Sequence, residues 1–388
     1  MKNTFTLLFT LFTLTLSAHL LTNDAYISIL TCEPGEELYS VFGHNAIRIY
    51  EPGQFDIVYN YGTFEFSDDF YMQFAQGKLN YKLSRSGFPD FNYEYLMTNR
   101  AVDEQILALD SLDKQRLFDL LEENYLPENR YYLYDFFYDN CATRIRDMLE
   151  EALGDRLQWH SKFPENEITF RDMIQRYLGN MHWGDFGIDL ALGMPCDKLM
   201  TAEQNMFLPD EVMFEADLAT LDGHPLVLEK NELLLSQDDL KMPKGTNWPL
   251  IMSVIVAFIA LLDLLLFKLG KVKTLFIPRT ILFIFGLLGV AVFLLWFATD
   301  HVTTKNNLNL IWASPLYLFF LYRLRAAQNQ LAWQHWYFKI TAILLTLMVV
   351  TGSFWPQSFH PTFYILAAAP LFVSIRIGWG TKSKGKTM

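Results

Sequence analysis

The stretch that decides the fold is residues 43–62, GHNAIRIYEPGQFDIVYNYG. Two runs rich in Ile, Val and Tyr flank a Glu-Pro-Gly-Gln segment in its middle. Such residues favour strands, and Pro-Gly favours a tight turn between them. The stretch therefore predicts a β-hairpin with the arms Asn45–Tyr50 and Phe55–Tyr61.

A histidine heads this hairpin, and a cysteine heads a helix further along the chain. His44 follows a glycine directly before the first arm, and Cys141 follows Asp139-Asn140 at the start of the amphipathic segment Cys141–Leu153. The N–H groups and dipole of a helix N-terminus stabilise a thiolate, and Arg144 adds positive charge. Nucleophilic catalysis needs this pairing, in which a thiolate attacks and an imidazole moves the proton.

The third catalytic group is expected on the second arm of the hairpin. If the chain turns about its Pro-Gly, the numbers of paired residues add up to about 105, which puts Asn60 or Tyr61 opposite His44. We choose Asn60 to orient the imidazole and keep Tyr61 and Asp56 as alternatives. The supporting residues that we expect around the site are Asn140, Arg48, Tyr61 and Arg144.

The flanking sequence predicts an α+β domain over residues 19–221. Further strands are expected at Asn23–Thr31, Tyr93–Thr98 and Ala101–Leu109, and an aromatic extended run at Arg130–Tyr138. Helices are expected at Ser111–Asn124, Pro164–Tyr177 and Thr201–Phe207, in addition to the one that begins with the cysteine. Residues 222–247, which contain Asp, Gly, Pro and Lys, are expected to be a tether.

The cysteine count narrows the chemistry of this domain. Cys32, Cys141 and Cys196 are the three cysteines, and an odd number in an oxidising compartment leaves one thiol over. Their wide spacing matches no zinc motif, so we expect neither a metal nor another cofactor. The unpaired thiol is expected to be Cys141.

The charge of the chain is split between its two halves. The net charge of −12 makes nucleic acid an unsuitable partner. From Ile251 onward, 12 Lys and Arg stand against 2 Asp and Glu, a balance of +10, so the first 250 residues carry −22. An acidic, water-soluble domain is thus joined to a basic and very apolar one. Residues 1–18 have the order of charge, apolar core and small residues typical of a secretory signal, or else form an uncleaved anchor.

Residues 248–380 are predicted to be an all-α membrane domain. Roughly 20 apolar residues cross a bilayer. Five runs are candidates: Trp248–Leu269, Phe276–Ala298, Leu308–Tyr322, Trp336–Phe354 and Thr362–Trp379. Lys and Arg gather in alternate loops and in residues 381–388, so the positive-inside rule puts these loops and this tail in the cytoplasm. The soluble domain then lies outside.

Two polar features of this half exceed what an anchor needs. Asp263 lies within the first run, where burying a carboxylate in the bilayer costs free energy. We expect it either to pair with Lys268 or to have a functional role. The outer loop Asp300–Asn307 is densely polar. Together with the number of spans, these features indicate that the membrane half holds or admits a lipid.

Two resemblances follow from these motifs. "FGHNAIRIY", "IVYNYG" and "DNCATRIRDML" resemble the permuted papain-like fold of the NlpC/P60-like and LRAT-like proteins, whose pattern falls here on His44, Asn60 and Cys141. Many members have a second His where this chain has Asn60. "TCEPGEELYSVFGHNAIRI", "NCATRIRDMLEEAL", "MFLPDEV" and "DHVTTKNNLNLIWASPLYL", with the multi-span half, resemble the Lnb-type lipoprotein N-acyltransferases.

The second resemblance implies a ping-pong reaction in the bacterial inner membrane. Cys141 would take an acyl chain from a phospholipid as a thioester and pass it to the α-amine of a diacylglyceryl-cysteine lipoprotein. Two alternatives remain open. One is a membrane-tethered cell-wall peptidase or amidase of the NlpC/P60 type. The other is a non-enzymatic assembly protein in which Cys141 forms a disulfide with Cys32 or Cys196.

Overall fold

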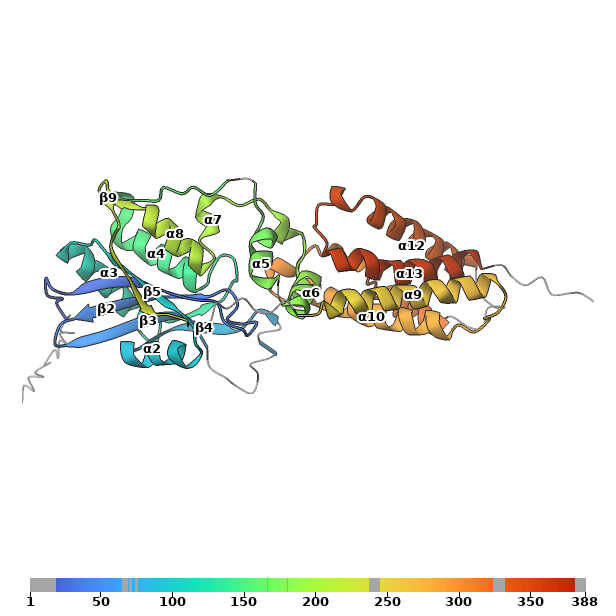
Figure 1. The fold of residues 1–388 in the computed structure, drawn as a ribbon, viewed down its shortest axis with the longest axis horizontal. Helices are drawn as coiled ribbons and strands as arrows, with labels where there is room; N and C mark the ends of the chain where they lie inside the picture. Colours follow the sequence, from blue (N-terminus) through green and yellow to red (C-terminus); the bar gives the residue numbers. More distant parts are fainter. Residues whose placement is uncertain are drawn as a thin grey trace, which may run out of the picture.

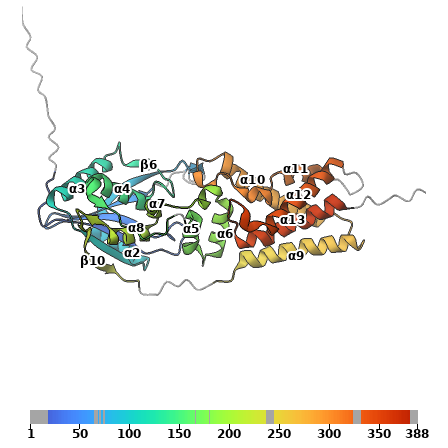
Figure 2. The ribbon, with the colours of Figure 1, turned by 90° about the horizontal axis from the view of Figure 1, so that it is seen from above.

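The computed structural model describes residues 19–64, 69, 72–73, 76–165, 167–179, 181–236, 245–323 and 332–380. The predicted signal at 1–18 and the basic tail at 381–388 lie outside these residues. Figure 1 shows a sheet-containing half and a helical half, and Figure 2 shows the same arrangement from above. In both views α5 (Phe170–Leu178) and α6 (His182–Ala191) lie where the two halves meet.

A seven-stranded sheet in the order β10-β5-β1-β2-β3-β4-β6 forms the centre of the first half. Every neighbouring pair in it is antiparallel. The strands are β1 (Tyr26–Cys32), β2 (His44–Glu51), β3 (Phe55–Thr63), β4 (Asn80–Gly87), β5 (Val102–Leu107), β6 (Tyr131–Leu133) and β10 (Val227–Leu234). The predicted hairpin is confirmed as β2–β3, but Ile47 pairs with Tyr59, so the register differs by one from the predicted one.

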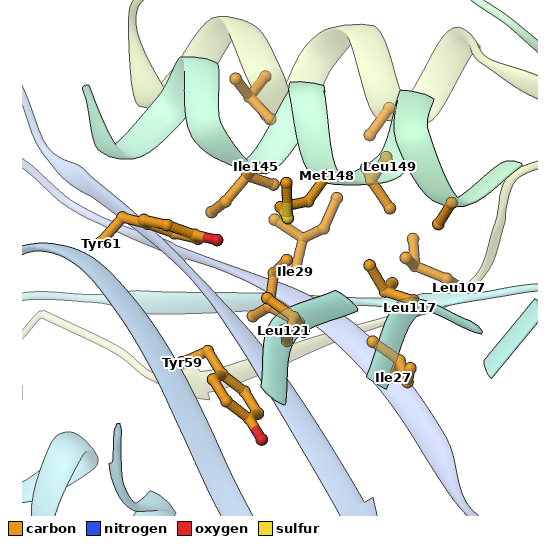
Figure 3. Close-up of a cluster of buried hydrophobic side chains, with 14 of the residues drawn as sticks. Ile27, Ile29, Tyr59, Tyr61, Leu107, Leu117, Leu121, Ile145, Met148 and Leu149 are labelled. Carbon is orange, nitrogen blue, oxygen red and sulfur yellow. The ribbon is translucent and has the colours of Figure 1, made fainter. Parts of the chain in front are cut away.

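Helices cover both faces of this sheet. On one face α4 (Cys141–Leu153) and α3 (Ser111–Tyr125) bury an apolar cluster against β1, β2 and β3, which includes Ile29, Tyr59, Ile145 and Leu149 (Figure 3). On the other face α2 (Phe88–Met97) packs Phe91 and Tyr95 against Leu30, Ala46 and Val58. Successive residues of a strand point to opposite faces, which explains why β2 serves both clusters. The remaining elements of this half are α7 (Ala202–Asn205), α8 (Pro209–Leu218), η1 (Gly154–Arg156), η2 (Met194–Asp197) and a small sheet of β7 (Leu157–Gln158), β8 (Thr220–Leu221) and β9 (His224–Pro225).

Three local predictions need correction. The strand expected at Tyr93–Thr98 is the second half of α2, where Pro89 stands in the first helical turn and the buried residues are four apart, a helical spacing. The helix expected at Pro164–Tyr177 begins only at Phe170, because Thr169 and Asp172 form a capping box there. Within the tether expected at 222–247, Val227–Leu234 is the edge strand β10, which pairs with β5.

The second half is helical. It contains α9 (Trp248–Lys268), α10 (Phe276–Phe297), α11 (Leu316–Arg323), α12 (Ala332–Val350) and α13 (Pro361–Trp379), with the short turns η3 (Val302–Thr304), η4 (Leu308–Ile311) and η6 (Gly352–Phe354). Among the described residues, α9, α10 and α13 are long and apolar enough to cross a membrane. The third predicted span, Leu308–Tyr322, is divided into η4 and α11, because Pro315 interrupts it.

The partner of Asp263 also differs from the expected one. Asp263 on α9 forms a buried ion pair with Arg376 of α13, and Arg376 donates a further hydrogen bond to the carbonyl of Thr274 at 2.5 Å. Lys268 is five residues from Asp263 on the same helix, which places it about 140° around the axis, out of reach. The pair therefore joins two of the helices that are long and apolar enough to cross a membrane.

Polar side chains from two outer loops of the helical half hold the end of α6. Asn307 donates to the carbonyls of Leu190 at 2.9 Å and Ala191 at 3.0 Å, and Gln357 donates to that of Leu192 at 3.3 Å. These carbonyls end a helix and need such donors. The densely polar loop found in the sequence thus docks the sheet domain onto the membrane domain.

Candidate active site

Cys141 is the first residue of α4, and Asn140 fixes this start of the helix. The Asn140 side chain accepts hydrogen bonds from the N–H groups of Ala142 at 2.8 Å and Thr143 at 3.0 Å. Its amide also donates to the carbonyls of Phe136 and Phe207, both at 2.8 Å. The Asn140 side chain is buried with all these bonds formed, so it holds the backbone of Cys141 in place.

His44 is the first residue of β2, the strand on which α4 packs. Its Nε2 lies 2.6 Å from Oδ1 of Asn60 on β3, which fixes the ring. The other ring nitrogen, Nδ1, is thereby left for the hydrogen bond that His44 forms with Cys141. The structure thus brings together the three residues proposed from the sequence, although Asn60 does not lie directly opposite His44.

The electrostatics of the pair favour a charged thiolate and imidazolium. Burial raises the pKa of Cys141, but the charge and hydrogen bond of His44 and the backbone N–H groups of Asn45 and Ala142 outweigh it, so the pKa is below its ordinary value. Burial lowers the pKa of His44, yet the interaction with Cys141 and the bond to Asn60 raise it overall. An ion pair of this kind makes a strong nucleophile at neutral pH.

Gly62 lets the backbone of β3 lie close to Cys141 and His44, and the sequence interpretation did not include this residue. A Cβ atom at this position would lie 3.5 Å from Cβ of Cys141 and 3.8 Å from Cε1 of His44. Its φ of +86° and the irregular register between Asn60 and Thr63 mark a bulge in β3. A glycine at the end of a strand run was the signal available in the sequence.

Two tyrosines of the aromatic run face the same thiol. Tyr132, Tyr134 and Cys141 belong to one apolar cluster, and the Cys141 charge adds to burial in raising the pKa of both tyrosines. Tyr134 stacks on Tyr81 with 4.3 Å between ring centroids. Sequence reasoning described this aromatic cluster only as an extended segment.

The supporting residues are distributed unevenly. Arg144 forms a bidentate ion pair with Asp139 and lies over the Tyr132 ring at 4.3 Å, beside the site. Tyr61 is part of the core under α4 (Figure 3).

Arg48 has no place in the catalytic group. It pairs with Asp56 at 2.8 Å and Glu104 at 2.9 Å, and its guanidinium lies 3.6 Å from the centre of the Phe88 ring. It is therefore a structural residue. The same ion pair accounts for Asp56, the other alternative for the third group.

All three cysteines are free thiols. Cys32 and Cys196 are buried, which raises the pKa of each to about 12, and Cys196 donates to the carbonyl of Thr303 at 3.4 Å. A disulfide to Cys141, the basis of the non-enzymatic alternative, is not formed. Cys141 is thus the one cysteine whose environment lowers its pKa.

One group among the described residues has the ligand types for a metal ion: Asp185, Asp189 and His360. Both carboxylate oxygens of Asp189 already accept hydrogen bonds, from Arg171 at 2.6 Å and Gln175 at 3.0 Å. Asp185 and His360 bond each other at 3.0 Å across the junction of the two halves. These bonds make the group part of a polar network between α5, α6 and the start of α13.

The fold and the site define a class: a membrane protein whose sheet domain presents a paired cysteine and histidine. Residues 15–178 match the family model of the Lnb N-terminal periplasmic domain, and residues 243–384 match that of the Lnb transmembrane domain. The chain belongs to the Lnb family and has the architecture of the Lnb-type lipoprotein N-acyltransferases, membrane enzymes that modify lipoproteins. No curated protein and no solved structure matches the chain.

Proposed function

We propose that this protein transfers an acyl chain from a phospholipid to the α-amine of a diacylglyceryl-cysteine lipoprotein through a thioester on Cys141. The sheet domain would be a permuted papain-like domain in the periplasm, and the chain would lie in the inner membrane with its C-terminus in the cytoplasm. The observation that carries the proposal is the Cys141–His44–Asn60 arrangement in a domain joined to helices long and apolar enough to cross a membrane.

In the first half-reaction the Cys141 thiolate attacks the ester carbonyl of the phospholipid. The carbon–oxygen bond of the ester breaks, and the His44 imidazolium donates its proton to the leaving alkoxide, which departs as a lysophospholipid. Asn60 keeps the His44 ring oriented during this transfer. The acyl group is now held as a thioester.

In the second half-reaction the α-amine of the lipoprotein attacks the thioester. His44, now neutral, accepts the proton that the amine loses, and the carbon–sulfur bond breaks to release the thiolate. The product is an amide, and the ion pair of Cys141 and His44 is restored. Both lipid substrates lie in the outer leaflet, so a site held at that surface can receive each in turn.

The test is the intact mass of the purified full-length protein after incubation with phospholipid. We expect the mass of one acyl chain to be added to the wild type and lost again when a diacylglyceryl-cysteine peptide is supplied. The Cys141→Ala variant should gain no mass. Cys196→Ala, which removes a buried thiol outside the site, is the matched control and should still be acylated.

Two results would contradict the proposal. One is an acyl adduct that persists in Cys141→Ala. The other is a strain carrying only Cys141→Ala whose lipoproteins keep their N-acyl chain while its muropeptide profile changes. That second outcome would favour the cell-wall peptidase or amidase instead.

A further inference from the structure

Exposed apolar side chains gather on the sheet domain near the membrane helices. Tyr39 is 83% exposed, Trp183 is 59% exposed and Leu38 is 45% exposed. A Cβ atom on Gly184 would lie 3.2 Å from Cδ1 of Leu38, so the loop of Leu38 and Tyr39 rests on the start of α6, beside Trp183. We call Leu38, Tyr39 and Trp183 the apolar rim.

The height of this rim is set by its contacts with the membrane half. His182, next to Trp183, bonds the carbonyl of Gly245 at 3.0 Å, three residues before α9 begins at Trp248. The Trp183 ring contacts Phe186 with 6.0 Å between centroids, and Phe186 contacts Phe363 of α13 at 5.2 Å. Trp183 therefore lies level with the outer ends of two transmembrane helices. Trp and Tyr are the residues that favour this interfacial depth.

The rim is also joined to the active site through the chain and through aromatic packing. The loop that carries Tyr39 ends at Gly43, directly before His44. Phe42 in this loop contacts Phe136 at 4.9 Å, and the carbonyl of Phe136 accepts a hydrogen bond from Asn140, the cap of the Cys141 helix. The residues that position both catalytic groups thus adjoin the loop that carries the rim.

We infer that the apolar rim inserts into the outer leaflet and forms the surface over which a lipid substrate passes from the bilayer to Cys141. The occupant is the lipid surface because the rim adjoins the outer end of α9, where Trp248 and Ile251 are apolar and exposed. Glu36 and Glu37, both exposed, adjoin the rim in sequence, so attraction to anionic headgroups does not drive this contact. Insertion rests on apolar and aromatic burial.

The membrane contact can be tested without any reaction. A photo-crosslinking benzoylphenylalanine is placed singly at position 39, at position 183 or at position 112, in full-length protein reconstituted in vesicles of phosphatidylethanolamine with a minority of phosphatidylglycerol. Leu112 is the control, because it is 80% exposed but lies on α3, at the far end of the sheet domain in both views of the fold (Figures 1 and 2). We expect positions 39 and 183 to crosslink to phospholipid about tenfold more than position 112, and equally well when phosphatidylcholine replaces phosphatidylglycerol. Equal crosslinking at all three positions would overturn the inference.

The second part of the inference, that a lipid substrate passes over the rim, rests on the proposed function and is tested separately. A Tyr39→Ser/Trp183→Ser double variant should acylate Cys141 about tenfold more slowly from vesicles, but at the wild-type rate from a water-soluble short-chain ester. An equal loss with both donors, or a loss with neither, would contradict a role in lipid entry. If wild-type protein crosslinks to lipid at the rim but is never acylated, the proposed function fails while the membrane contact stands.

Discussion

Arg171 provides the sharpest test of how the sheet domain is held above the membrane. Its guanidinium is buried on α5 and all three of its nitrogens donate, to Asp189 at 2.6 Å, to Asp197 at 2.9 and 3.0 Å, and to the carbonyls of Leu192 and Gly193 at 3.3 and 3.2 Å. The change Arg171→Met keeps much of the side-chain volume but leaves two buried carboxylates without their cation. We expect it to destabilise the sheet domain.

The size of the effect follows from burial. Removing one partner of a buried ion pair costs about 3–5 kcal/mol. For a domain of about 200 residues, about 1 kcal/mol lowers Tm by about 2–4 °C, so Tm should fall by roughly 6–20 °C. The assay is thermal unfolding of the full-length chain in detergent, followed by tryptophan fluorescence.

A matched control lies on the same helix. Arg176 is 52% exposed and its contact with Glu211 is 3.8 Å long, so Arg176→Met should cost no more than about 1 kcal/mol. If Arg171→Met lowers Tm no further than Arg176→Met does, the reasoning about the buried network is refuted.

The pH dependence of the same variant gives a second check. Burial holds the pKa of Asp189 above its ordinary value even with Arg171 present. A carboxyl with a raised pKa in the folded state binds its proton more tightly there, so lowering the pH favours folding. Arg171 itself lowers the pKa of Asp189, so removing it raises that pKa further, and the variant gains more stability than wild type as the pH falls. The Tm difference between Arg171→Met and wild type should therefore narrow between about pH 7 and about pH 5. A difference that widens would contradict this assignment.

Four further predictions concern the site and the membrane helices. Because the pKa of Cys141 is lowered and that of His44 is raised, the rate of Cys141 acylation should be bell-shaped in pH, falling below the first apparent pKa of the pair and above the second. The His44→Ala variant should react with iodoacetamide at Cys141 about tenfold or more slowly than wild type at neutral pH, and an unchanged rate would argue against the ion pair. Asn140→Ser keeps a capping oxygen but removes the two donors to buried carbonyls, so it should lower stability by about 1–3 kcal/mol, measured as a shift in Tm against wild type. Asp263→Leu alone or Arg376→Leu alone should lower Tm strongly, whereas the double variant should recover most of the loss; a double variant as unstable as either single one would show that the pair is not the cause.

Part of the fold could be predicted because its causes are local in the sequence. The β2–β3 hairpin follows from strand-forming residues on both sides of a Pro-Gly turn, and the start of α4 follows from Asn140 as its cap. The strands β4 and β10 were not predicted, because Asn80–Gly87 and Val227–Leu234 are rich in polar residues and become strands only through their neighbours. α2 was mistaken for a strand because its aromatic residues favour both structures.

The candidate site divides in the same way. Cys141 and His44 were found because each has a local signal, a helix cap and a strand start after glycine. Asn60 was chosen from an assumed register that was one residue off. It contacts His44 diagonally, from the neighbouring strand β3, rather than from the position directly opposite. The role of Gly62 and the partner of Asp263 involve residues far apart in the sequence, which pattern reasoning does not connect.

The sequence by itself determined the two-part organisation of this protein and pointed to Cys141 and His44, which we propose as its nucleophile and base. Charge, hydropathy and caps act through near neighbours, so they can be read along the chain. The tertiary structure alone decided the order of the strands and the Asp263–Arg376 pair. It also decided the contact of the end of α6 with the outer loops, through Asn307 and Gln357. These features depend on contacts between distant segments, each of which has several partners open to it until the whole chain packs.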